Sequence, residues 1–154
     1  MKTFRLLPGY FKIIGLLMVI PGAILGAMTL YGEFEFPWLD FKIREKDEFL
    51  LPAVENFTNE LAFFLIIAGL LFLVFSREKE EDERVQQIRL EAFQWSFLVH
   101  FVLVIIANWF MFSENFFFVL IYGMFTPLLV FLGRFYYVLK IKEAPSFNEN
   151  EGEV

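Results

Sequence analysis

The sequence contains no cysteine and a single histidine, His100. The absence of cysteine excludes disulfides, thiolate metal sites and a cysteine nucleophile, and it removes the usual indication of redox compartment. A single histidine excludes a histidine-based metal or catalytic cluster within one chain. An H-E-x-x-H motif, a glycine-rich phosphate loop and paired carboxylates within the apolar blocks are also missing. We therefore expect a protein that is not an enzyme and that has no metal site and no cofactor.

Charge is scarce and unevenly distributed. Of the 154 residues, 21% are charged and 58% are hydrophobic, including 23 Phe, and the net charge is −6. The acidic residues gather at 33–60, 78–83 and 143–153, and no basic patch is interleaved with aromatic residues. A direct nucleic-acid partner is therefore not expected. Polar residues are too few to cover the surface of a soluble domain of this length, so the expected surroundings are the lipid bilayer.

Four apolar blocks are candidates for membrane spans, because a transmembrane helix needs ~20 mostly apolar residues. We expect an all-α polytopic membrane protein with a four-transmembrane-helix bundle. Its helices are predicted at about 12–32, 57–76, 80–112 and 115–140, with an external loop at 33–58 and a disordered acidic tail at 143–154. A cleaved signal peptide at the N-terminus is a weaker alternative, because the first apolar block is too long and no A-x-A-like site follows it.

The positions of the basic residues predict the orientation of the chain. Ten of the 13 Lys and Arg residues flank the N-terminus, the connection between the second and third spans, or the C-terminal end of the fourth. Cytoplasmic segments of membrane proteins carry an excess of Lys and Arg. The sequence therefore predicts a multi-pass protein of the inner (plasma) membrane of the cell with both termini in the cytoplasm.

Small residues are predicted to mediate helix packing, because lipid provides no hydrophobic drive between helices and close backbone approach depends on them. The candidates are Gly22, Gly26, Gly69 and Gly123. Packing within one chain is the simpler interpretation. The Gly22-x-x-x-Gly26 pair also fits the contact surface of a homo-oligomer.

Two polar residues within the third span are the candidates for function inside the membrane. His100 and Asn108 fall on one broad helical face. Each is expected to form an interhelical hydrogen bond, with Thr126 or Tyr122 as partner, or else to line a permeation path. Kinks predicted at Pro21 and Pro127 are compatible with such a path.

The strongest local signal is a charged helical stem that leads into the third span. Residues 82–97 contain no Pro or Gly, and both Glu80–Arg84 and Glu83–Gln87 have i,i+4 spacing, so the helix is expected to begin near Glu80. The candidate partner-binding residues are Asp82, Glu83, Arg84, Gln87, Ile88 and Glu91. A stem that is merely solvated and stabilises the helix entrance is the alternative.

The pattern Asp82-Glu83-Arg84, followed by Ile88, Ala92 and Phe97 ahead of an apolar helix, resembles a motif of small uncharacterised bacterial membrane proteins. In these domain-of-unknown-function families, DER…I…A…F lies between the second and third of their helices, and some members are encoded beside small helix-turn-helix regulators. The Phe-rich external segment departs from the compact loops of these families. The resemblance implies a bacterial membrane protein with a cytoplasmic partner.

Two functions follow from these patterns. The first is a non-enzymatic integral membrane protein that binds or sequesters a cytoplasmic partner, with a regulator as one candidate, through the stem. The alternative is a small oligomeric transport or permeation unit that uses His100 and Asn108.

Overall fold

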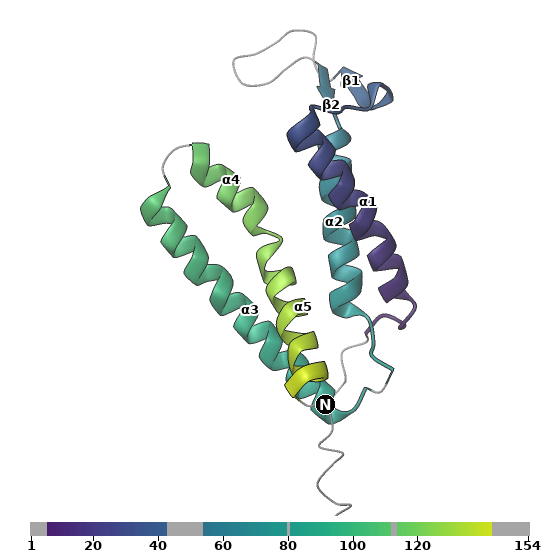
Figure 1. Ribbon diagram of the computed structural model, residues 1–154, viewed down its shortest axis with the longest axis vertical. Coiled ribbons are helices and arrows are strands. Elements are labelled where there is room, and N and C mark those ends of the chain that lie inside the picture. The colour runs from purple at the N-terminus through teal and green to yellow at the C-terminus, as the bar shows by residue number, and fades with distance from the viewer. Residues whose placement is uncertain (1–5, 43–53, 80, 112–113, 143–154) are drawn as a thin grey trace, which may run out of the picture. The chain divides into compact units, whose positions relative to one another are not determined.

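The computed structural model describes residues 6–42, 54–79, 81–111 and 114–142. The chain divides into two compact units, Met1–Ser76 and Arg77–Val154. Each unit is an antiparallel helical hairpin (Figure 1). The all-α prediction is confirmed, while the acidic tail at 143–154 lies outside the described residues.

The first unit pairs α1 (Phe11–Gly32) with α2 (Thr58–Phe75) along most of their lengths. The helices approach closely at glycine: a Cβ atom placed on Gly69 would lie 2.7 Å from the carbonyl oxygen of Gly15 and 2.7 Å from Cγ2 of Val19. At Gly22 the corresponding atom would lie 2.9 Å from Cβ of Leu65, whereas at Gly26 the nearest atom is 3.8 Å away. Gly15, Gly22 and Gly69 thus lie in the contact within this hairpin.

The segment between α1 and α2, predicted as an external loop, contains short regular elements. A single 3₁₀ turn, η1 (Pro37–Leu39), leads into β1 (Asp40–Lys42), which pairs antiparallel with β2 (Val54–Asn56). The register places Asp40 opposite Asn56. The side chain of Asn56 accepts a hydrogen bond from the backbone N–H of Thr58 at 2.9 Å, which satisfies one of the free donors at the start of α2.

The second unit contains α3 (Glu83–Phe110), α4 (Glu114–Gly123), α5 (Thr126–Tyr137) and the π-helical turn η2 (Val138–Lys142). Helix α3 begins at Glu83, later than the predicted start near Glu80. Asp82 has an extended backbone, and its carboxylate accepts a 2.8 Å hydrogen bond from the N–H of Val85. Asp82 is therefore the N-cap of α3. Glu80, predicted to pair with Arg84 on a helix, lies outside the described residues.

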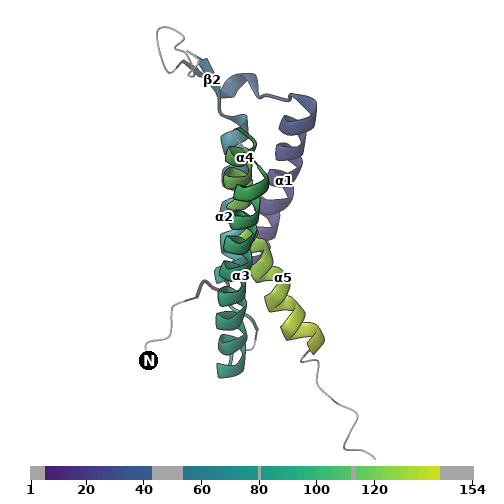
Figure 2. The same ribbon diagram turned by 90° about the vertical axis from the view of Figure 1, so that its left-hand side faces the viewer.

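The predicted fourth helix, 115–140, is not continuous. The chain bends by 45° between α4 and α5, and the change of direction is visible in Figure 2. Pro127 accounts for the break because it has no N–H to donate to the carbonyl of Gly123 and its ring disfavours a continuous helix. In contrast, α1 continues without a break past Pro21.

The described residues contain 3 helices that are long and apolar enough to cross a membrane, or 4 if the bent pair forms one span. These are α1, α2 and α3, with α4 and α5 as the bent pair. An apolar segment in lipid must satisfy its backbone groups internally, which a helix does. The length and composition of the helices therefore agree with the four predicted crossings.

Candidate functional site

The N-terminal part of α3 has one buried stripe. Val85, Ile88, Ala92 and Ser96 are 8%, 6%, 1% and 1% exposed. Their spacing of three or four residues places them on one side of a helix. The principal contacts of α3 within its unit are with α5, whose Phe131 and Phe135 are each 2% exposed. The stem is thus anchored by burial of one side.

The opposite side of the same helix is exposed. Glu83, Gln87, Leu90 and Gln94 follow one another at helical spacing, and Glu91 lies beside them. We call these five exposed residues the stem face. Leu90 is 60% exposed within this surface, and the exposed Phe93 and Phe97 follow it one and two turns further along α3. Exposed apolar side chains beside polar groups are typical of a contact that becomes dry when a partner covers it.

The residues predicted for partner binding therefore separate into different roles. Glu83, Arg84, Gln87 and Glu91 are exposed on α3, as a docking surface requires. The other two have structural roles as well: Asp82 caps the helix, and Ile88 is buried in the stripe.

Two members of the stem face, Leu90 and Gln94, were missed in the sequence analysis. Their spacing from Glu83 and Gln87 was a signal that could have identified them. Recognising it requires knowing which side of the helix is buried.

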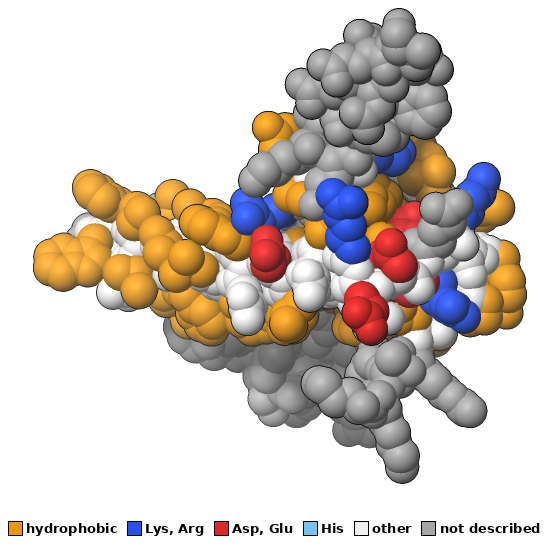
Figure 3. Space-filling view, turned by 90° about the horizontal axis from the view of Figure 1, so that it is seen from below, with side chains coloured by type: hydrophobic (Ala, Val, Ile, Leu, Met, Phe, Trp, Pro, Cys, Tyr) orange, Lys and Arg blue, Asp and Glu red, His pale blue; other side chains and the backbone are white. Residues whose placement is uncertain are grey.

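An ion pair and a cation–π contact hold the stem in place. Arg89 Nη2 lies 3.3 Å from Oε2 of Glu81, and the two side chains are 15% and 5% exposed. The Arg89 guanidinium also lies 4.8 Å from the centre of the Phe135 ring. Because both charges are largely shielded, this pair orients the start of α3 more firmly than a surface ion pair would. Figure 3 shows acidic and basic side chains among hydrophobic ones in the view from below.

His100 lies beside the break in the α4–α5 segment. Its Cε1 is 3.8 Å from the position that a Cβ on Gly123 would occupy, and its ring packs edge-on against Phe101 at 5.3 Å. Among the residues with described placement, neither Thr126 nor Tyr122 forms a hydrogen bond with it. Asn108 is exposed. The permeation alternative stays a prediction.

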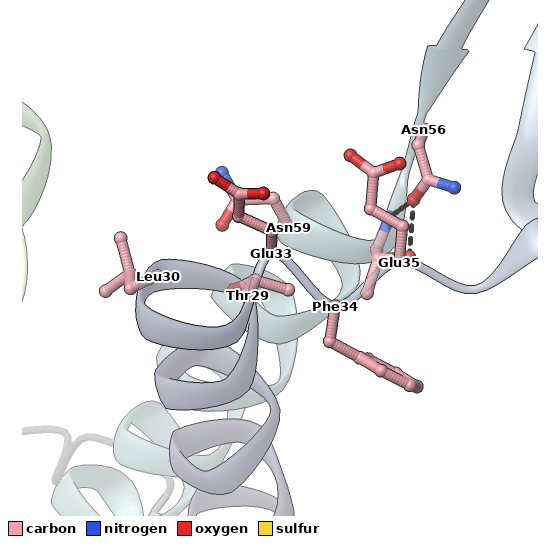
Figure 4. Close-up of a pocket in the computed structure, with 8 residues that line it drawn as sticks. Thr29, Leu30, Glu33, Phe34, Glu35, Asn56 and Asn59 are labelled. Atoms are coloured by element: carbon pink, nitrogen blue, oxygen red, sulfur yellow. Dashed lines mark hydrogen bonds between the residues drawn. The ribbon is translucent and has the colours of Figure 1, made fainter.

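A cavity of about 450 Å³ lies where α1 ends and α2 begins. Its polar lining includes Glu33, Glu35, Asn56 and Asn59, which Figure 4 shows around the end of α1 and the start of α2. Asn56 has a structural role there, because it donates hydrogen bonds to the carbonyl of Phe36 at 2.9 Å and to Asp40 at 2.5 Å. No cluster of three potential metal-ligating side chains occurs in the described part of the chain.

The comparisons with known proteins identify no relative. No protein-family model, no curated protein and no solved structure matches this chain.

Proposed function

We propose that this chain is a non-enzymatic integral membrane protein that binds a cytoplasmic protein through the stem face. The observation that carries the proposal is the division of the stem into two sides: the Val85–Ser96 stripe is buried, and the stem face stays exposed around Leu90. The resemblance of the DER…I…A…F pattern to that of small bacterial membrane proteins points to the same segment, and a regulator is one candidate partner.

The chemistry of the stem face defines the partner. Glu83 and Glu91 favour a surface that presents basic groups, and Leu90 favours an apolar recess on that surface. The stem is preorganised, since Asp82 caps it and the Glu81–Arg89 pair fixes its start. A partner therefore does not have to order the helix as it binds, which lowers the entropic cost of association.

The topology can be tested with reporter fusions. Fusions placed after Val154 and within residues 45–48 should report opposite sides of the membrane, with the C-terminus in the cytoplasm. The physical reason is the excess of Lys and Arg in the segments assigned to that side. The chain should also remain in the pellet after carbonate extraction. If both fusions report the same side, four crossings are excluded and the stem is wrongly placed.

The docking surface can be tested with Leu90→Glu. The substitution puts a charge at the centre of the stem face, so recovery of the cytoplasmic partner from native membranes should fall by about tenfold or more. Leu90 is exposed and glutamate is a good helix former, so helix stability should change by less than ~0.5 kcal/mol. The measurement is the amount of partner that co-purifies at equal membrane levels of the two proteins.

Arg77→Glu is the matched control. It adds negative charge at an exposed position outside α3 and should leave recovery of the partner unchanged. Equal recovery with wild type and Leu90→Glu would show that the stem is only a solvated helix entrance. An equal loss with both variants would show that bulk charge, and not the stem face, governs binding.

A further inference from the structure

Arg134 packs against the ring of an aromatic residue. Its guanidinium carbon lies 4.8 Å from the centre of the Trp95 ring, which joins α5 to α3. Its Nε is shielded from solvent and has no hydrogen-bond partner. Among the residues that the structure describes, none forms an ion pair or a hydrogen bond with this side chain.

The shielded Nε of Arg134 favours an external acceptor, because a donor that loses water without gaining a partner raises the free energy of the folded state. Glu91 lies one turn before Trp95 on α3, but it forms no ion pair with Arg134. Arg134 itself is partly exposed. An acceptor can therefore approach its Nη atoms from outside the helix pair.

The surroundings of Arg134 define the class of acceptor. Trp95 and Tyr137 are 46% and 56% exposed, and Trp and Tyr are enriched at the level of lipid headgroups. Phosphate groups occupy the same depth, and the planar fork of arginine matches two phosphate oxygens. The sequence of α5 and η2 carries Arg134, Lys140 and Lys142 and no acidic residue, so the lipid should carry net negative charge.

We propose that Arg134 and Trp95 form a binding site for the phosphate of an anionic phospholipid in the leaflet at the C-terminal end of α5. The Trp95 ring fixes the plane of the guanidinium, and the guanidinium donates to the phosphate oxygens. The inference rests on the membrane insertion of the proposed function. It does not depend on the stem face, which involves a soluble partner.

The test is a titration of the purified full-length chain with phosphatidylglycerol in a neutral detergent, read by native mass spectrometry. Arg134→Gln should weaken the apparent affinity by about tenfold to a hundredfold, as loss of a charged hydrogen-bonding group does. Arg134→Lys should fall between wild type and Arg134→Gln, since it keeps the charge but not the fork. Equal affinity of wild type and Arg134→Gln would overturn the proposal.

Lys140→Gln is the matched control, because it removes one positive charge near the end of the same helix, where Lys140 lies 5.5 Å from the Tyr136 ring. Its affinity should stay within about threefold of wild type, as expected for a single screened charge. A loss as large as that of Arg134→Gln would show attraction to bulk charge and no site.

Two further measurements test other acceptors for the Arg134 guanidinium. Millimolar inorganic phosphate should not compete with the lipid, and full competition would overturn the lipid assignment. Glu91→Gln should leave lipid binding unchanged, whereas strong enhancement would identify Glu91 as the acceptor of Arg134.

Thermal unfolding without lipid checks that each variant is folded. If Arg134→Gln does not fold, the lipid affinities of Arg134→Lys and Lys140→Gln are compared instead. A larger loss with Arg134→Lys supports the site, and equal losses contradict it. Failure of the docking proposal would leave these titrations unchanged, because no cytoplasmic protein is present. Failure of membrane insertion would be visible beforehand in carbonate extraction.

Discussion

Gly69→Ala is expected to destabilise the α1–α2 hairpin by ~1–3 kcal/mol, in spite of the higher helix propensity of alanine. The new methyl carbon would lie 2.7 Å from the backbone oxygen of Gly15 and 3.0 Å from the backbone nitrogen of Val19. A backbone atom cannot turn away as a side chain does, so the two helices must separate. Separation loses dispersion contacts along the pair, which are the main source of helix association in lipid.

The measurement is the unfolding free energy of the purified protein in detergent, from denaturant titration. Gly133→Ala is the control, because the space around Gly133 is empty to 4 Å and the substitution should be neutral or stabilise by up to ~1 kcal/mol. A Gly69→Ala protein as stable as wild type would mean that the helices do not meet at Gly15 and Gly69.

The combination of Gly15→Ala with Gly69→Ala offers a sharper test of the same contact. Each Cβ would meet the carbonyl oxygen of the other glycine at 2.7 Å. Once one methyl group has separated the helices, the second is accommodated at lower cost. The loss in the double variant should therefore be smaller than the sum of the two single losses. Additive losses would indicate that the two glycines lie in independent contacts.

Phe135→Ala should destabilise the second unit by ~3 kcal/mol, at the lower end of the range for buried aromatic residues. Phe135 is 2% exposed, stacks on Phe131 with ring centres 5.6 Å apart, and carries the Arg89 guanidinium on its face. Its removal opens a cavity and takes away the cation–π support of Arg89. The expected cost is at the low end because lipid is as apolar as the contact between the helices. Moving apolar side-chain atoms from that contact into lipid therefore costs little free energy.

Thermal and denaturant unfolding in detergent measure this loss, with Tyr137→Ala as the control. Tyr137 is 56% exposed two residues further along α5, and its replacement should cost less than ~0.5 kcal/mol. Partner recovery should fall with Phe135→Ala as well, since Arg89 no longer fixes the stem. Similar stabilities of the two variants would contradict the assignment of Phe135 to the core.

Local features of the chain were predictable because their causes are local. The apolar blocks predict helices, since backbone groups in lipid have no other partners. Pro127 predicts an interruption near its position because it lacks a donor, although the sequence does not distinguish a kink from the 45° break that separates α4 from α5. Pro21, with the same chemistry, leaves α1 continuous.

The candidate site was only partly predictable. The charged stretch with Glu83, Arg84, Gln87 and Glu91 was predicted as the candidate site from its charge, its helical continuity and the DER…I…A…F pattern. Ile88, one of the residues predicted for partner binding, is buried, and Leu90 was overlooked, because the sequence of one helix does not show which of its sides another helix covers. The rotation of α3 about its axis is fixed by α5, a segment distant in the chain.

The sequence by itself determined that the chain forms apolar helices, where small residues permit close approach, and where charge gathers, because these depend on composition and on neighbours within a turn or two. Only the tertiary structure decided that Gly15 meets Gly69, that Ile88 is buried and Leu90 exposed, and that Arg134 lies over Trp95. Each of these features depends on how two helices pack against each other. The relative rotation and offset of a helix pair arise from contacts along its whole length, which no local pattern encodes.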